Sequence, residues 1–160
     1  MIIVLMGVTG SGKTTVGQNL AASLGWQYFD ADEFHSAANI EKMKSGVPLN
    51  DADRKPWLES LQRVIRDSLK KAEPAVLACS ALKESYRDML LIDERVQFVY
   101  LKGDYDLIKE RLRARSDHYM NPDLLDSQFE TLEEPNDALQ IDIGSSPDAI
   151  VEIIRQRLCI

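Results

Sequence analysis

Hydrophobic residues along the chain fall into two alternating patterns, short apolar runs and longer segments with helical spacing. The short runs, which predict β-strands, lie at 2–6, 27–29, 75–79, 96–101 and 139–143. The segments that predict helices are 13–24, part of 33–45, 53–71, 83–91, 104–115, 123–132 and 147–158. Because strands alternate with helices, we expect an α/β three-layer sandwich, with a five-stranded parallel sheet covered by helices on both faces.

The first strand and helix are the best defined of these elements. Residues 1–6 read Met-Ile-Ile-Val-Leu-Met, a continuous apolar run that suits a parallel strand buried on both faces. Val16, Leu20 and Leu24 then recur at helical spacing, and Gly25 is placed to end the helix. In an open parallel sheet, ligands bind at the carboxyl ends of the strands, so the segment after this strand is where we expect chemistry.

That segment carries a phosphate-binding pattern. Residues 7–14 read Gly-Val-Thr-Gly-Ser-Gly-Lys-Thr and fit the P-loop pattern G-x-x-x-x-G-K-[ST] at every fixed position. The glycines let backbone N–H groups turn inward around an anion, and the positive end of the following helix faces the same phosphates. We expect Lys13 to contact the β- and γ-phosphates of a nucleotide and Thr14 to ligate Mg²⁺. The predicted nucleotide-binding residues are Gly7, Val8, Thr9, Gly10, Ser11, Gly12, Lys13, Thr14 and Thr15.

Composition narrows the class of protein. The 160 residues suit one domain, 1–160, and 44% hydrophobic with 28% charged residues is ordinary for a globular protein. A net charge of −7 argues against nucleic acid as the main partner. We expect no membrane association, because no apolar run could span a bilayer and no secretory leader is evident. Cys79 and Cys159 form no metal or disulfide pattern, which suits the cytoplasm.

Other P-loop classes lack their own motifs here. No guanine-reading Asn-Lys-x-Asp segment is present, and the strand at 75–79 is followed by Ser80 rather than by the Asp of motor and transport ATPases. Asp30 and Asp32, after the second strand, are placed to supply the missing carboxylate. An Asp-x-Asp there resembles shikimate kinase and its relatives, small kinases of the adenylate kinase type. We expect Asp30 to hold Mg²⁺ and Asp32 to face substrate; a solvated loop is the alternative.

Longer motifs are similar to the gluconokinase family. They lie at 35–43, 46–58, 79–83, 86–88 and 127–135. The resemblance covers nearly the whole chain and implies ATP-dependent phosphorylation of D-gluconate, a shikimate-kinase-like fold, and a homodimer. It also implies a substrate-binding helical region at about 33–71 and a lid at about 115–123. The sequence departs from the family pattern at Ala31, Ser36 and Asp117, where Gly, Pro and Gly are common.

Residues suited to a sugar acid occur within these motifs. A carboxylate favours the planar fork of an arginine, and Arg54 resembles the carboxylate-binding arginine of shikimate kinase, with Arg87 as a second candidate. Asp32, His35 and Gln128 are the candidates for binding hydroxyls. Surface ion pairs with Asp51 or Asp88 remain the alternative for the two arginines.

Arg111 lies just before the expected lid, and Arg115 is the first residue of that lid. Arg111 and Arg115 are four residues apart on one helix face, and a similar pair in adenylate kinases stacks on adenine and holds phosphate, respectively. The alternative is pairing with Glu110 or Asp106. The expected catalytic residues are Lys13, Asp32 and Arg115. A kinase of another small polar acid or of a nucleotide remains open, as does a nucleotide-binding switch without transfer activity.

Overall fold

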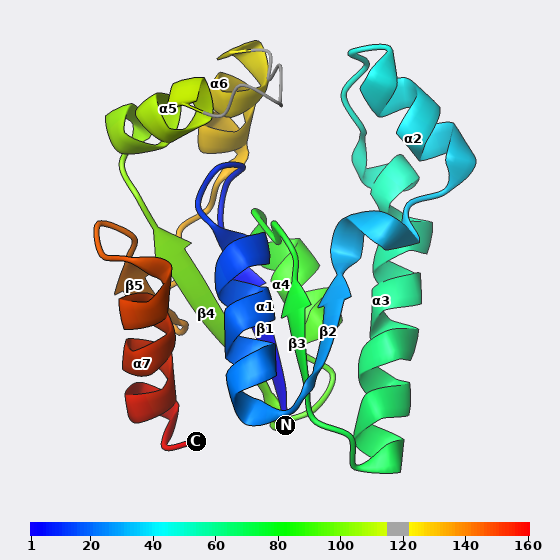
Figure 1. Ribbon diagram of the computed structural model, residues 1–160. Coiled ribbons are helices and arrows are strands. Elements are labelled where there is room, and N and C mark those ends of the chain that lie inside the picture. The colour runs from blue at the N-terminus through cyan, green and yellow to red at the C-terminus, as the bar shows by residue number, and fades with distance from the viewer. Residues whose placement is uncertain (115–121) are drawn as a thin grey trace.

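The computed structural model describes residues 1–114 and 122–160 and contains a five-stranded sheet in which every neighbouring pair is parallel (Figure 1). The strand order is β2-β3-β1-β4-β5. The strands are β1 (Ile2–Met6), β2 (Gln27–Asp30), β3 (Ala75–Ala78), β4 (Val96–Lys102) and β5 (Leu139–Asp142). The five predicted strands are therefore confirmed, with ends that differ by one residue at most.

Helices cover both faces of the sheet, as predicted. They are α1 (Lys13–Leu24), the short 3-10 helix η1 (Ala31–Phe34), α2 (Ala37–Lys44), α3 (Asp51–Lys71), α4 (Glu84–Leu90), α5 (Tyr105–Ala114), α6 (Pro122–Thr131) and α7 (Pro147–Leu158). Helices α1 and α7 pack together on one face, and α3 packs with α4 on the other (Figure 1).

The alternation of side chains along β1 explains the two layers. Ile2, Val4 and Met6 belong to the core that includes α3 and α4, whereas Ile3 and Leu5 belong to the core that includes α1 and α7. All five residues are buried, so the central strand is apolar on both faces. This is the arrangement that a continuous apolar run predicts for the middle strand of a parallel sheet.

The region predicted as a helix within 33–45 divides into two elements. The 3-10 segment ends with His35 as its C-cap, and Ser36 is the N-cap of α2, with the Ser36 hydroxyl accepting from the Asn39 backbone N–H at 3.2 Å. Helix α3 begins at Asp51, two residues earlier than predicted, because Asn50 and Asp53 form a reciprocal capping box. Both differences come from capping side chains that satisfy backbone donors.

Three segments meet at the carboxyl ends of three neighbouring strands, β2, β3 and β1. The P-loop follows β1, the Asp30–Asp32 segment follows β2, and Ser80 follows β3. The Gly7 backbone N–H donates to the Ser80 carbonyl at 3.3 Å, which joins two of the segments directly. In Figure 1, α5 and α6 lie on one side above this edge and α2 on the other.

The predicted lid, 115–123, lies outside the described residues except where α6 begins at Pro122. Within residues 1–114 and 122–160, none of the helices has the length and apolarity needed to cross a membrane.

Candidate active site

The P-loop has the backbone shape that its glycines predict. Gly7 has a φ of +149°, and a Cβ there would lie 2.9 Å from the Leu101 carbonyl oxygen, so a side chain would displace backbone. Gly10 has a φ of +77° and lies against Leu112. Gly12 precedes α1 without capping it by a side chain, so the first N–H groups of the helix are left for an anion.

Lys13 is folded back over this loop. Its Nζ donates to the carbonyl oxygens of Gly7 at 3.0 Å and Val8 at 2.9 Å, which fixes the ammonium group inside the curve of the loop. Burial lowers the pKa of Lys13, whereas the nearby charge of Asp32 acts in the opposite direction. The loop therefore holds a localised positive charge that faces the two carboxylates after β2.

A polar pocket of about 290 Å³ opens between these groups. Its lining combines the P-loop, the segment after β2, the end of β3 and one residue from α6. The lining residues are Thr9, Gly10, Gly12, Lys13, Thr14, Thr15, Asp30, Asp32, Ala78, Ser80 and Gln128. The pocket thus brings together six of the nine predicted phosphate-binding residues and both predicted carboxylates, whereas Gly7, Val8 and Ser11 do not line it.

The two carboxylates have different surroundings. Asp30 caps η1: its Oδ1 accepts from the Asp32 backbone N–H at 3.0 Å, and its Oδ2 lies 3.5 Å from the donating Tyr28 hydroxyl. Loss of solvation and the neighbouring charge of Asp30 raise the pKa of Asp32, while Lys13 and His35 oppose that change. Asp30 is thus tied to its own turn, and Asp32 lies where its proton affinity is increased.

Tyr28 is a site residue that the sequence analysis missed. Its ring occupies the space beside Gly17, where an added Cβ would lie 2.7 Å from the Tyr28 Cε2 atom. Its hydroxyl donates to Asp30 Oδ2 at 3.5 Å, and burial raises its pKa to about 12. The available signal in the sequence was Gly17, a buried glycine of α1 that leaves room for the aromatic ring of Tyr28 in the next strand.

The oxygen atoms that line the pocket fit Mg²⁺. Thr14 supplies a hydroxyl, and Asp30 and Asp32 supply carboxylates, so all the side-chain donors are oxygen. Mg²⁺ prefers oxygen ligands and keeps several waters, which makes one or two protein ligands sufficient when phosphates supply the others.

Helix α3 supports the segment after β2. The Trp57 indole N–H donates to the Ala31 carbonyl at 2.7 Å, and the His35 ring stacks on Trp57 with centroids 4.5 Å apart at 11°. Asn39 Nδ2 lies 3.5 Å from His35 Nδ1. Burial lowers the pKa of His35 below 6.5, so its imidazole is neutral at pH 7 and can accept or donate a hydrogen bond.

Arg54 lies three residues before Trp57 in the same helix, α3. Its Nη1 donates to the Leu49 carbonyl and to the Tyr86 hydroxyl, the latter at 3.3 Å. The pKa of His35 is lowered mainly by burial, and the positive charge of Arg54 acts in the same direction. The direct pair with Asp51 that was the alternative is replaced by a bridge, because Tyr86 lies between the two side chains.

Arg87 differs most from its prediction. Its side chain is buried, and its Nη1 donates to the carbonyl oxygens of Ala81 and Leu82, both at 3.1 Å. Ala81 has a left-handed φ of 41°, so these bonds secure a strained turn after β3. This placement favours a structural role over the predicted contact with substrate.

The remaining predicted residues lie on the α5 and α6 side. Gln128 lines the pocket, and its Oε1 accepts from the Thr9 backbone N–H at 2.6 Å, so it supports the P-loop. Arg111 donates to the Ile143 carbonyl and therefore lies beside the loop between β5 and α7. Arg115 lies outside the described residues.

Comparison with known proteins identifies the family. The sequence model described as Shikimate kinase matches residues 9–156. A probable gluconokinase of Dictyostelium discoideum is 48% identical over 168 residues, covering 96% of this chain and 84% of that protein. The thermoresistant gluconokinase of Escherichia coli strain K12 is 44% identical over 155 residues, covering 94% of this chain and 89% of that protein. The chain belongs to the gluconokinase family. A gluconokinase crystal structure from Sinorhizobium meliloti 1021 superposes with a TM-score of 0.83 at 37% identity, covering 98% of this chain and 94% of that one.

Family membership agrees with the site. The protein is a P-loop kinase, so the phosphate-binding loop belongs to a catalytic site, and the alternative of a switch without transfer activity is set aside. The two departures within the described residues are compatible with the local structure. Ala31 is buried and its carbonyl accepts from Trp57, and Ser36 serves as the N-cap of α2.

Proposed function

We propose that the protein transfers the γ-phosphoryl group of ATP to the 6-hydroxyl of D-gluconate. The observation that carries this proposal is the pocket in which the P-loop faces Asp30 and Asp32, with the wall of His35 and Arg54 close by. The arrangement provides a phosphate site, a proton acceptor and groups for a polar acid. The gluconokinases among the relatives support the choice of acid.

The nucleotide half of the site is formed by residues 7–15 and α5. Backbone N–H groups of the loop and the start of α1 bind the phosphates, and Lys13 neutralises charge near the β- and γ-phosphates. Arg111 is suited to stack on adenine because it lies beside the loop that precedes α7. Thr14 and Asp30 would hold Mg²⁺, which when bound offsets negative charge on the phosphates.

The acceptor half lies between β2 and α3. Arg54 binds the carboxylate of the acid through the part of its fork that is not used by Leu49 and Tyr86. Neutral His35, fixed by stacking on Trp57, contacts hydroxyl groups. Gln128 takes part through the P-loop, and any contact of Arg87 with substrate is secondary to its bonds with Ala81 and Leu82.

Asp32 links the two halves. It orients the attacking hydroxyl and accepts its proton, and its raised pKa favours that acceptance. Lys13 stabilises the charge that spreads over the transferred group, together with Arg115 of the predicted lid. Closure of the lid over the pocket would exclude water and suppress hydrolysis of ATP.

An acceptor panel tests this function. ADP release should be measured with Mg·ATP and D-gluconate, gluconate stereoisomers, shikimate, nucleoside monophosphates, or no acceptor. We expect D-gluconate to give by far the fastest release. A faster rate with another acceptor would reassign the substrate. Cytoplasmic location, a homodimer and a single domain over residues 1–160 stay predictions that accompany this proposal.

A further inference from the structure

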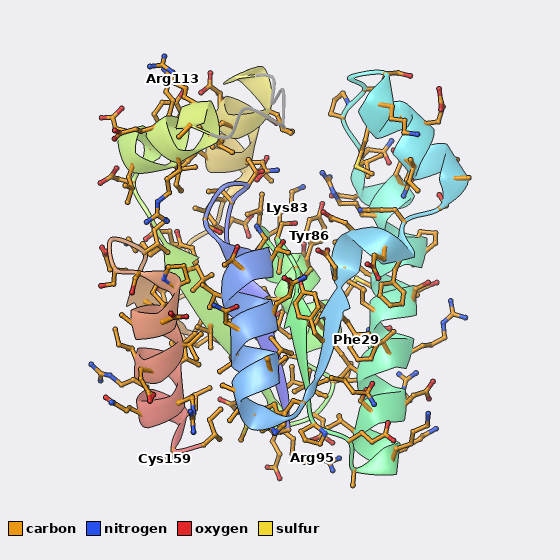
Figure 2. All side chains as sticks on the ribbon, viewed as in Figure 1. Phe29, Lys83, Tyr86, Arg95, Arg113 and Cys159 are labelled. Atoms are coloured by element: carbon orange, nitrogen blue, oxygen red, sulfur yellow. The ribbon has the colours of Figure 1, made fainter. Side chains whose placement is uncertain are left out.

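A group of charged side chains beside the acceptor site has no part in the function described so far. Asp51 is the first residue of α3, and Lys83 and Tyr86 come from the start of α4. The Lys83 ammonium lies 3.0 Å from Asp51 Oδ1, and the Tyr86 hydroxyl donates to the same oxygen. Figure 2 labels Lys83 and Tyr86 close together near the carboxyl end of β3.

Arg54 joins this group from the other side of Tyr86. Its Nη1 donates to the Tyr86 hydroxyl at 3.3 Å, and its Cζ lies 5.7 Å from the centroid of the ring. The Lys83 Nζ lies 5.5 Å from the same centroid. The Arg54 and Lys83 side chains therefore both lie over the Tyr86 ring. Lys83 contacts the Asp51 carboxylate directly, and Arg54 is linked to it through the Tyr86 hydroxyl.

The charges around that position are unequal. Lys83 and Arg54 contribute two positive charges, and Asp51 contributes one negative charge, so the group has a net positive charge that favours binding of an anion. The contact between Lys83 and Asp51 is also open to solvent, with side-chain exposures of 32% and 70%. Exposed ion pairs contribute little stability, so an incoming anion could replace Asp51 at low cost.

The position lies at the mouth of the acceptor site. Lys83 follows Ser80, which lines the pocket, after a turn of two residues that Arg87 secures from below. Arg54 lies three residues before Trp57 in α3, the His35 ring stacks on Trp57, and the His35 backbone N–H donates to the Asp32 carbonyl at 3.4 Å. A sugar acid whose terminal hydroxyl reaches Asp32 would extend toward this group.

We propose that Lys83 is a second carboxylate-binding residue that acts with Arg54, and that Asp51 is a resident counter-ion which the substrate's carboxylate displaces from Lys83. The inference rests on the proposed function and names the residues that select an acid over a neutral sugar. The Asp51 carboxylate marks the place of the substrate carboxylate, since its oxygen accepts from both Lys83 and Tyr86.

The proposal predicts that changes at Lys83 and at Asp51, the two members of one ion pair, have opposite effects on gluconate binding. Removing Lys83 should weaken binding of gluconate, because a charge-assisted contact is lost. Removing the charge of Asp51 should strengthen it, because a competing anion is gone and the positive potential rises. An ordinary structural ion pair would give the same direction for both changes.

The test compares two acceptors, D-gluconate and D-gluconamide, in which a neutral amide replaces the carboxylate. Lys83→Met should raise the KM for gluconate by about 10-fold and leave the KM for gluconamide unchanged. Lys83→Arg should retain most of the preference for gluconate. Asp51→Asn should lower the KM for gluconate by about 2- to 5-fold, with the KM for ATP unchanged in every variant.

Arg95→Met is the matched control, since Arg95 forms an exposed pair with Asp93 at 2.7 Å and lies toward the opposite end of the sheet from Lys83 (Figure 2). Equal changes in the constants for both acceptors in Lys83→Met would overturn the proposal, as would a higher gluconate KM in Asp51→Asn. If the unaltered protein transferred no phosphate to gluconate, the proposed function itself would be wrong. If the unaltered protein phosphorylates gluconate, the results with the variants test only the roles of Lys83 and Asp51.

Discussion

Replacing Asp32 by Asn should slow phosphoryl transfer while leaving ATP binding intact. Asparagine keeps the shape of the side chain but cannot take up the hydroxyl proton. Loss of a general base costs about 10²–10⁴-fold in rate. A loose phosphoryl transition state needs less help from its base, so we expect a decrease of about 10²-fold in kcat.

The structure also predicts that the matching change at Asp30 has a different effect on activity. Asp30 holds the η1 turn through the Asp32 N–H and faces the Tyr28 hydroxyl, in the position proposed for Mg²⁺ binding. Asp30→Asn should therefore raise the Mg²⁺ concentration needed for half-maximal rate, and excess Mg²⁺ should restore part of its activity. Asp32→Asn should remain slow at any Mg²⁺ concentration.

The pH dependence of kcat provides an independent check on the role of Asp32. Burial and the charge of Asp30 raise the pKa of Asp32 above 3.8. As the pH falls through that raised pKa, Asp32 becomes protonated and can no longer accept a proton, so kcat should fall. The low rate of Asp32→Asn should lack this acid limb.

Steady-state kinetics over Mg²⁺ concentration and pH, with calorimetry of ATP binding, completes the assay. The reasoning would be refuted if excess Mg²⁺ restored Asp32→Asn but not Asp30→Asn, because the two carboxylates would then have exchanged roles. An unchanged kcat in Asp32→Asn would remove the proton-acceptor role altogether.

Three further changes test other parts of the site. Lys13→Met should fold normally but lose orders of magnitude in kcat, because the Lys13 charge matters most as the γ-phosphoryl group moves; near-normal turnover would contradict this. Arg54→Lys should raise the KM for gluconate by about 10- to 100-fold with little change for ATP, whereas equal effects on both would indicate a structural role. Gly7→Ala should lower stability by about 1–3 kcal/mol in thermal unfolding and weaken nucleotide binding, since its Cβ would lie 2.8 Å from Ser11 Oγ and 2.9 Å from the Leu101 oxygen; an unchanged melting temperature would refute the clash.

The sequence predicts the sheet well because its signal is local. The apolar run of β1 and the spacing of the P-loop glycines can each be recognised within a short segment of sequence, so the strand, the loop and α1 could be predicted without knowledge of their distant contacts. The boundaries near residues 31–53 were harder to predict. They depend on capping bonds from Ser36, Asn50 and Asp53, and each of these residue types is also common in turns.

Contacts between distant segments were beyond prediction from sequence. The role of Arg87 depends on the carbonyls of a strained turn, and nothing in its local pattern distinguishes it from a substrate-binding arginine. The hydrogen bond from Thr9 to Gln128 spans 119 residues, and the contact between Asp51 and Lys83 spans 32. Such pairs form only when the sheet brings its loops to one edge, so residue type alone could not reveal them.

The position of the new phosphate ester tests the central claim most directly. The proton-coupled ³¹P spectrum of the product made from Mg·ATP and D-gluconate distinguishes a phosphate on a primary carbon from one on a secondary carbon. We predict a triplet from the two protons of carbon 6, appearing together with ADP in equal amounts. A doublet would place the ester on another hydroxyl, and inorganic phosphate appearing with ADP without any ester signal would contradict phosphoryl transfer to gluconate.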